Sequence, residues 1–128
     1  MICVDANILV AALDSQDLFH EAASEAIVGH RKVIALNVTC AEALVHPYRV
    51  GRSDEARLIL EEYGVETVAV TNAIAYKAAD LRATHGNRNF PMLDALVVAT
   101  GIESGASVVT TDSKWPSFPN VDIQLLGK

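Results

Sequence analysis

The sequence has few cysteines, a shortage of basic residues and no long hydrophobic run. Its two cysteines, Cys3 and Cys40, lie in apolar segments and do not form a C-x-x-C pair. This usage favours a reduced intracellular protein with two buried thiols over a disulfide framework. No histidine lies at ligand spacing from either cysteine, which argues against a structural zinc site. No apolar run approaches the roughly 18 residues that span a bilayer.

The start of the chain has no basic segment of the kind that opens a secretory signal, since Met1 leads directly into an apolar run that ends at Asp5. We therefore expect a soluble cytoplasmic protein with no membrane association. The chain has 10 Lys and Arg against 16 Asp and Glu, a formal charge of −6. This balance argues against a broad basic DNA-binding face. It does not exclude a nucleic-acid enzyme, because metal-binding acids add to the negative count.

Strand-like and helix-like segments alternate along the 128 residues, a length that fits one domain covering residues 1–128. We expect Asn37 and Asn72 to cap two of the helices and Pro47 to end or kink one. Apolar runs predict strands at 2–4, 33–36, 65–70, 106–109 and 121–125. Helices are predicted at 6–13, 18–29, 38–46, 53–63 and 72–85, with another that begins near Met92. This order favours an α/β fold with a mostly parallel sheet and helices on both faces.

The stretch from Phe90 to Trp115 organises the chain, because it places two acids at the ends of apolar elements. Asp94 lies near the start of a helix, and no Lys or Arg within four residues can pair with it. A carboxylate among apolar neighbours is costly unless a cation or strong hydrogen-bond donors meet it. Asp112 then follows the strand that ends near Val109.

Two earlier acids occupy similar places. Asp5 directly ends the first strand, and Glu42 lies in the early turns of the helix that leaves the second. We expect both to meet Asp94 and Asp112 at the carboxyl edge of the sheet, where ligand sites form in open α/β folds. Four anions in one pocket repel one another unless a counter-charge is present. Mg²⁺ or Mn²⁺, which prefer oxygen ligands, would supply it and would activate a phosphodiester and an attacking water.

Each acid also has a simpler explanation, so only their joint placement favours a metal site. The macrodipole favours a negative charge such as Asp94 in the first turn of a helix. Asp112 fits a turn, and Glu42 has His46 at i,i+4. A Ser or Cys nucleophile would need a histidine partner, but the histidines all fit helix surfaces or helix ends: His20, His30, His46 and His85.

Four fragments, in this order and over most of the chain, resemble the PIN-domain family and more narrowly the VapC-type toxin ribonucleases. They are V-D-A-N-I-L at the start, A-E-A-L after the second strand, L-D-A-L-V-V-A-T-G before the last long strand and V-V-T-T-D at its end. The resemblance implies a three-layer α/β/α fold and a Mg²⁺- or Mn²⁺-dependent endoribonuclease acting on RNA. It also implies a homodimer held inactive by a cognate VapB-type antitoxin. Position by position, it places the metal site and the catalysis at Asp5, Glu42, Asp94 and Asp112, with supporting roles for Asn7 and Thr110.

The sequence departs from the family pattern at Lys114, where many relatives carry a further acid two residues after the last motif Asp. The metal site then rests on four acids, and Lys114 either contacts an RNA phosphate or stays a solvated charge. Arg88, in the loop before Asp94, is the first candidate for a phosphate contact. The other candidates are Arg49, Arg52 and Arg82.

Two other functions remain open at this point. A PIN domain that processes RNA without an antitoxin fits the same residues. A phospho-receiver signalling module also carries an acidic Mg²⁺ pocket on a parallel sheet. It needs adjacent acids after the first strand and an Asp at the end of the central strand. Here Asp5 is followed by Ala6, and the strand at 65–70 is followed by Thr71 and Asn72.

Overall fold

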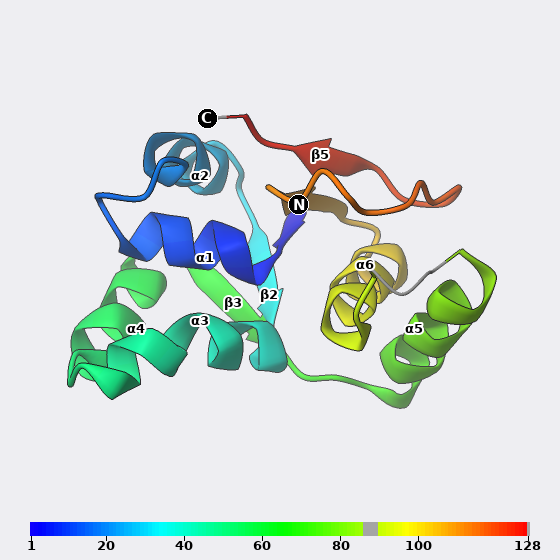
Figure 1. Ribbon diagram of the computed structural model, residues 1–128, viewed down its shortest axis with the longest axis horizontal. Helices are drawn as coiled ribbons and strands as arrows, with labels where there is room; N and C mark the ends of the chain where they lie inside the picture. The colour runs from blue at the N-terminus through cyan, green and yellow to red at the C-terminus, as the bar shows by residue number, and fades with distance from the viewer. Residues whose placement is uncertain (86–89, 128) are drawn as a thin grey trace.

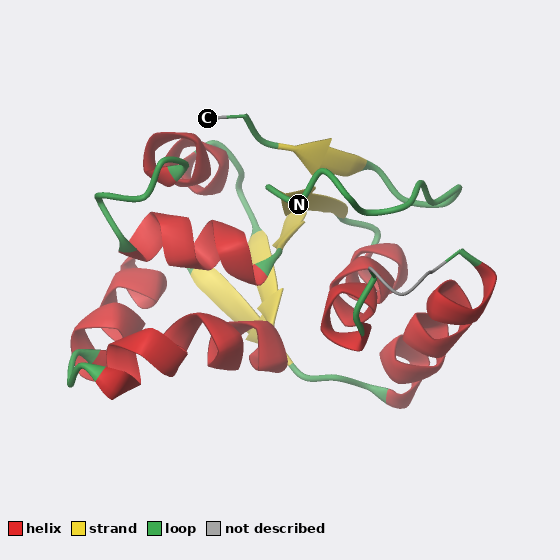
Figure 2. Cartoon of the chain, in the orientation of Figure 1, coloured by secondary structure: helices red, strands yellow, loops and turns green. Residues whose placement is uncertain are grey.

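The structure, a computed structural model, describes residues 1–85 and 90–127. Five parallel strands form one sheet in the order β3-β2-β1-β4-β5, with helices on both sides (Figure 2). The strands are β1 (Ile2–Val4), β2 (Val33–Leu36), β3 (Val65–Val68), β4 (Ser107–Thr110) and β5 (Ile123–Leu125). The helices are α1 (Ala6–Leu13), α2 (His20–Val28), α3 (Asn37–Arg49), α4 (Ser53–Glu62), α5 (Asn72–Thr84) and α6 (Met92–Ser104). The expected α/β fold with a parallel sheet is confirmed.

Side-chain alternation along the strands divides the core between the two faces of the sheet. In β1, Ile2 and Val4 pack into the apolar cluster of α1, α2, α3 and α4. Cys3, between them, packs on the other face with Val97 of α6. Figure 1 shows α1 to α4 on one side of the sheet and α5 and α6 on the other. The three-layer α/β/α arrangement is therefore confirmed as well.

The start and the end of α3 differ from the prediction. Leu36 is the N-cap, so Asn37 is the first helical residue rather than the cap. The helix also passes through Pro47 and ends at Arg49 instead of stopping at His46. A proline lacks an N–H and breaks one helical hydrogen bond. In the last turn this loss is tolerated, because the helix ends two residues later.

The boundary between β3 and α5 also differs from the prediction. β3 ends at Val68, which pairs with Leu36, and β2 itself ends at Leu36. The chain beyond Val68 therefore has no neighbouring strand to pair with, and the predicted strand is two residues too long. The cap of α5 is Thr71 rather than Asn72, because the Thr71 hydroxyl accepts a hydrogen bond from the Ile74 N–H at 3.2 Å.

β1 is the central strand and determines where a site can form. From its carboxyl end the chain runs through α1 and α2 to β2 on one side, while β4 pairs with β1 on the other. Such a reversal of strand order opens a crevice at the carboxyl ends of the strands. Both thiols are free, Cys3 fully buried and Cys40 only half-buried. Within 1–85 and 90–127, the helices are too short or too polar to cross a membrane.

Candidate active site

Asp5 follows β1 directly and forms the N-cap of α1. Its Oδ1 accepts a hydrogen bond from the Ala6 N–H at 2.7 Å, and its Oδ2 accepts one from the Thr110 hydroxyl at 2.8 Å. Only 4% of the residue is exposed. Burial raises the pKa of Asp5, whereas the Thr110 and Ala6 hydrogen bonds lower it. The negative charges of Glu42 and Asp112 raise this pKa further. Asp5 is thus held in one orientation, and no ion pair to it is found among residues 1–85 and 90–127.

Thr110, the last residue of β4, joins two of the acids. Its buried hydroxyl donates to Asp5 and accepts a hydrogen bond from the Asp112 N–H at 3.1 Å. The Asp112 Oδ1 accepts a hydrogen bond from the Lys114 N–H at 2.8 Å. Asp112 therefore closes a turn, as its simpler explanation required. Its charge also raises the pKa of Asp5 and Asp94, so the same side chain faces the other acids.

Asp94 lies in the first turn of α6, half-buried beside the carboxyl ends of the strands. Burial and then the charge of Asp5 raise the pKa of Asp94 to about 6. The Trp115 indole Nε1–H donates to its Oδ2 at 3.2 Å and lowers the pKa, while the charge of Asp112 raises it. Trp115 is itself held edge to face against Phe90, with ring centroids 5.8 Å apart.

Glu42 approaches the other acids from α3 and is the most exposed of them. Partial loss of water around its carboxyl, and then the charge of Asp94, raise the pKa of Glu42. The alternative pairing with His46 is not observed. In the described part of the chain, ion pairs join Lys32 to Glu66 and Lys77 to Asp80.

The four acids form one acidic rim, the name used below for Asp5, Glu42, Asp94 and Asp112. They are near enough that the charge of at least one other member raises the pKa of Asp5, Glu42 and Asp94. Among residues 1–85 and 90–127, however, no three His, Cys, Asp or Glu side chains are already gathered as a metal-ligand set. Like charges repel, so a site of this composition closes only around a counter-charge. An all-carboxylate donor set fits Mg²⁺ or Mn²⁺. The metal site itself stays a prediction.

The remaining site predictions have mixed outcomes. Thr110 lies between two acids, as described above, whereas Asn7 is exposed in the first turn of α1 with no side-chain hydrogen bond among the described residues. Lys114 and Arg49 are exposed, Lys114 two residues after Asp112 and Arg49 at the end of α3. Arg88 lies outside the described residues. Their contacts with RNA stay predictions.

Trp115 is the residue that sequence reasoning missed. Its hydrogen bond to Asp94 joins positions separated by 21 residues, so no local pattern indicates it. The available signal was weak: a single tryptophan in the chain, three residues after Asp112. A buried indole N–H usually finds a hydrogen-bond acceptor.

An open groove of about 930 Å³ adjoins the rim at Glu42 and lies between α1, α3 and α4. Its apolar lining includes Val10 and Val50, 39% and 51% exposed. The other apolar lining residues are Leu13, Ala43, Pro47, Ala56 and Ile59. The charged or ionisable lining residues are Asp14, Glu42, His46, Arg52 and Glu55. The groove therefore combines an apolar floor with charges of both signs.

The PIN domain family model matches residues 2–122, and the chain belongs to the PIN domain family. A comparison of the sequence with curated proteins finds no match. The sheet order also differs from the 2-1-3-4-5 order of flavodoxin-like folds, which argues against the phospho-receiver alternative.

Solved structures with the same fold include several toxins. A toxin–antitoxin complex from Klebsiella pneumoniae superposes with a TM-score of 0.79 at 20% identity, covering 94% of this chain and 95% of that one. VapBC2 from Rickettsia felis, bound to a promoter DNA fragment, gives 0.73 at 16% identity, covering 99% and 100%. VapC20 from Mycobacterium tuberculosis, a sarcin-ricin loop cleaving toxin, gives 0.72 at 20% identity, covering 89% and 92%. At these identities the likeness shows a shared fold.

Proposed function

We propose that this protein is a divalent-metal-dependent endoribonuclease and the toxin of a VapBC-type toxin–antitoxin pair. The observation that carries the proposal is the acidic rim, which brings four carboxylates from separate segments of a PIN domain to one edge of the sheet. The similar folds of toxins in two-component complexes support the antitoxin part. A PIN domain that processes RNA without an antitoxin is the alternative.

The residues in and around the rim would have different roles. Asp5, Glu42, Asp94 and Asp112 would hold one or two Mg²⁺ or Mn²⁺ ions, which supply charge stabilisation at the phosphoryl oxygens and a lowered pKa for an attacking water. Thr110 keeps the Asp5 carboxylate oriented, and burial of Asp5 excludes water from that side. No side-chain nucleophile is required, and we expect products with a 5′-phosphate and a 3′-hydroxyl. Lys114, Arg49 and Arg88 are the proposed phosphate contacts.

The nuclease proposal is tested with purified protein, an RNA mixture and Mn²⁺. We expect cleavage that EDTA abolishes and that Asp94→Asn reduces by about 10²-fold or more, because charged groups at such sites contribute on this scale. Sequencing the RNA ends gives the target and the cleavage preference. Full activity of a folded Asp94→Asn variant would remove the catalytic role of the rim.

The groove beside Glu42 is the proposed binding site for the antitoxin. A partner segment with apolar side chains would cover Val10 and Val50, and a basic side chain at its end would reach the rim and compete with metal. Val10 lies on α1 beside the groove, whereas Tyr76 lies on α5 on the opposite side of the sheet. A substitution at Tyr76 is therefore a control for the same substitution at Val10.

The antitoxin proposal is tested by coexpression with the product of a small neighbouring gene. We expect Val10→Glu to weaken the complex and to release nuclease activity, whereas Tyr76→Glu, at a position 72% exposed, leaves the complex intact. The absence of any small neighbouring gene whose product binds would favour the RNA-processing alternative. The homodimer also stays a prediction, which analytical ultracentrifugation of the purified protein tests.

A further inference from the structure

One short segment contacts acids on both sides of the crevice. Thr110 begins the segment and donates to Asp5, whereas Trp115 ends it and donates to Asp94. Between them, the Asp112 N–H donates to the Thr110 hydroxyl, and the Asp112 Oδ1 accepts a hydrogen bond from the Lys114 N–H. The segment 110–115 therefore links the acid after β1 to the acid on α6, and its terminal contact comes from an indole.

The Trp115 indole can hold a carboxylate in place, but it cannot itself act as a metal ligand. Its Nε1–H is a donor only and carries no charge, so it neither binds a cation nor neutralises Asp94. The ring packs edge to face on Phe90, which is fully buried, and joins the apolar clusters of both α6 and β4. Because the donor reaches Oδ2, it restrains the rotation of the carboxylate, and in the described part of the chain no hydrogen bond to Oδ1 accompanies it.

We infer that Trp115 is a positioning residue that orients the Asp94 carboxylate for a divalent cation through its indole N–H. The inference rests on the proposed function, because it requires the acidic rim to bind metal. Carboxylate ligands are commonly held by such outer hydrogen bonds, and losing one typically weakens metal binding about 10- to 100-fold. A purely structural Trp115 would contribute only the packing of its ring.

Two substitutions separate the N–H from the ring. Trp115→Phe keeps an aromatic ring against Phe90 and removes the donor. Because Trp115 is the single tryptophan of the chain, global incorporation of benzothienylalanine replaces only this N–H by sulfur and nearly preserves the shape. Ser113→Ala, at an exposed neighbouring position, is the matched control. Circular dichroism and thermal melting establish that each protein is folded.

The test is a calorimetric titration of each metal-free protein with Mn²⁺. We expect the Kd for Mn²⁺ to rise about tenfold or more in both Trp115 variants and to stay within about twofold in Ser113→Ala. In the wild-type protein, Mg²⁺ should also change Trp115 fluorescence with a saturable midpoint. On RNA, the Trp115 variants should lose kcat with little change in KM, since Trp115 acts through Asp94.

The outcomes distinguish the inference from the proposed function. If the wild-type protein binds no Mn²⁺, the metal site fails and the inference falls with it. If the wild-type protein binds Mn²⁺ and the benzothienylalanine protein binds it equally well, the inference alone is overturned and Trp115 has only a packing role. Weaker binding in that protein, with an unchanged melting temperature, supports the inference even where Trp115→Phe is unstable.

Discussion

The two sides of the acidic rim are built differently. On the sheet side, Asp5 and Asp112 follow adjacent parallel strands, which are paired in register through Val4 and Val109. The Thr110 hydroxyl joins these two acids from within the buried core. On the helix side, Glu42 projects from α3 and is exposed, and Asp94 projects from α6 and is half-buried, as Asp112 is, whereas Asp5 is buried.

This contrast indicates which half of the site is preorganised. Strand pairing and buried hydrogen bonds fix the sheet side before any ligand arrives, because breaking them would leave buried polar groups without partners. Among residues 1–85 and 90–127, one side-chain hydrogen bond reaches an acid of the helix side, from Trp115 to Asp94, and Glu42 is exposed. A cation entering the rim would therefore meet a fixed sheet side, and the helix side would adjust to it.

Neutralising the sheet side should have the largest effect. Asp5→Asn keeps the shape of the side chain and removes its charge, so we expect nuclease activity to fall by about 10²- to 10³-fold. The melting temperature of the metal-free protein should change little, because removing a buried charge is offset by losing the acceptor of one of the two Asp5 hydrogen bonds. RNA cleavage assays and thermal melting measure the two effects. Activity retained in Asp5→Asn would show that cleavage does not need the negative charge of Asp5.

Removing the hydroxyl between the acids should have the next largest effect. Thr110→Val preserves the volume and leaves the Asp5 Oδ2 and the Asp112 N–H without their partner. We expect a loss of about 1–3 kcal/mol in the free energy of unfolding and a weakening of Mn²⁺ binding of about tenfold. Thr100→Val is the control, since Thr100 is equally buried but its hydroxyl donates to Leu96 of its own helix. Equal effects in both variants would contradict the special role of Thr110.

On the helix side, the raised pKa of Asp94 predicts how protein stability depends on pH. The pKa of Asp94 is raised to about 6 in the folded protein, so the folded state binds more protons than the unfolded state between pH ~4 and ~6. Ionised Asp94 therefore lowers stability as pH rises through this window, and the cost is constant above it. In EDTA, Asp94→Asn should stabilise the protein by on the order of 1 kcal/mol at pH 7.5, discounted for partial exposure, and by little at pH 4. Urea unfolding at the two pH values measures the gain, and a gain that grows towards pH 4 would refute the assignment.

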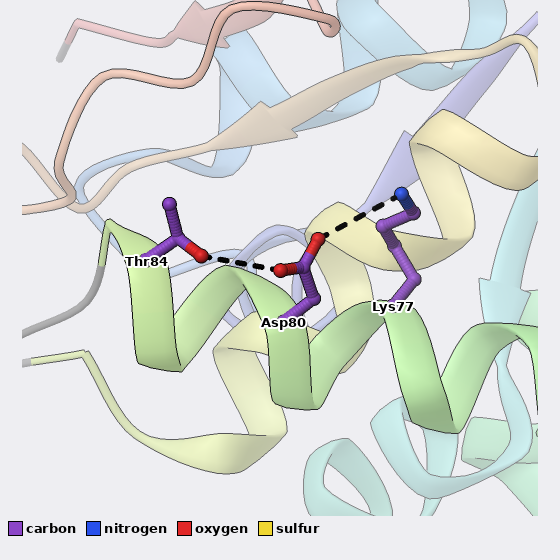
Figure 3. Close-up of polar contacts among 3 residues, drawn as sticks. All are labelled: Lys77, Asp80 and Thr84. Carbon is purple, nitrogen blue, oxygen red and sulfur yellow. Dashed lines mark hydrogen bonds and ion pairs between the residues drawn. The ribbon is translucent and has the colours of Figure 1, made fainter.

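An acid outside the rim should show the smallest effect. Asp80 on α5 accepts a hydrogen bond from the Thr84 hydroxyl at 3.1 Å and lies 4.0 Å from the Lys77 ammonium (Figure 3). Because these groups are largely solvated, we expect Asp80→Asn to change stability by less than about 0.5 kcal/mol and to leave nuclease activity unchanged. A large loss of activity would mean that the functional surface extends to α5.

The sequence predicted which elements carry the acids on both sides of the rim, whereas the helix caps and the contacts that orient the acids were harder to predict. An acid that directly follows a buried strand has its position set by strand pairing, so Asp5 and Asp112 could be placed from the chain alone. The helix ends were less accurate, because whether Leu36 or Asn37 caps α3 depends on how the strand delivers the chain. Trp115 could not be found at all, since its acceptor lies on another element. The RNA contacts stay predictions, because packing does not fix exposed basic residues.

The Thr110 hydroxyl and the Asp5 carboxylate are separated by 105 positions along the chain. During synthesis, the first strand therefore leaves the ribosome long before its second neighbour and the hydroxyl that orients its acid exist. A growing or prematurely terminated polypeptide lacks the complete rim, whatever helices it has already formed. For an enzyme that would attack RNA, this order of synthesis delays activity until β4 and Asp112 have been made.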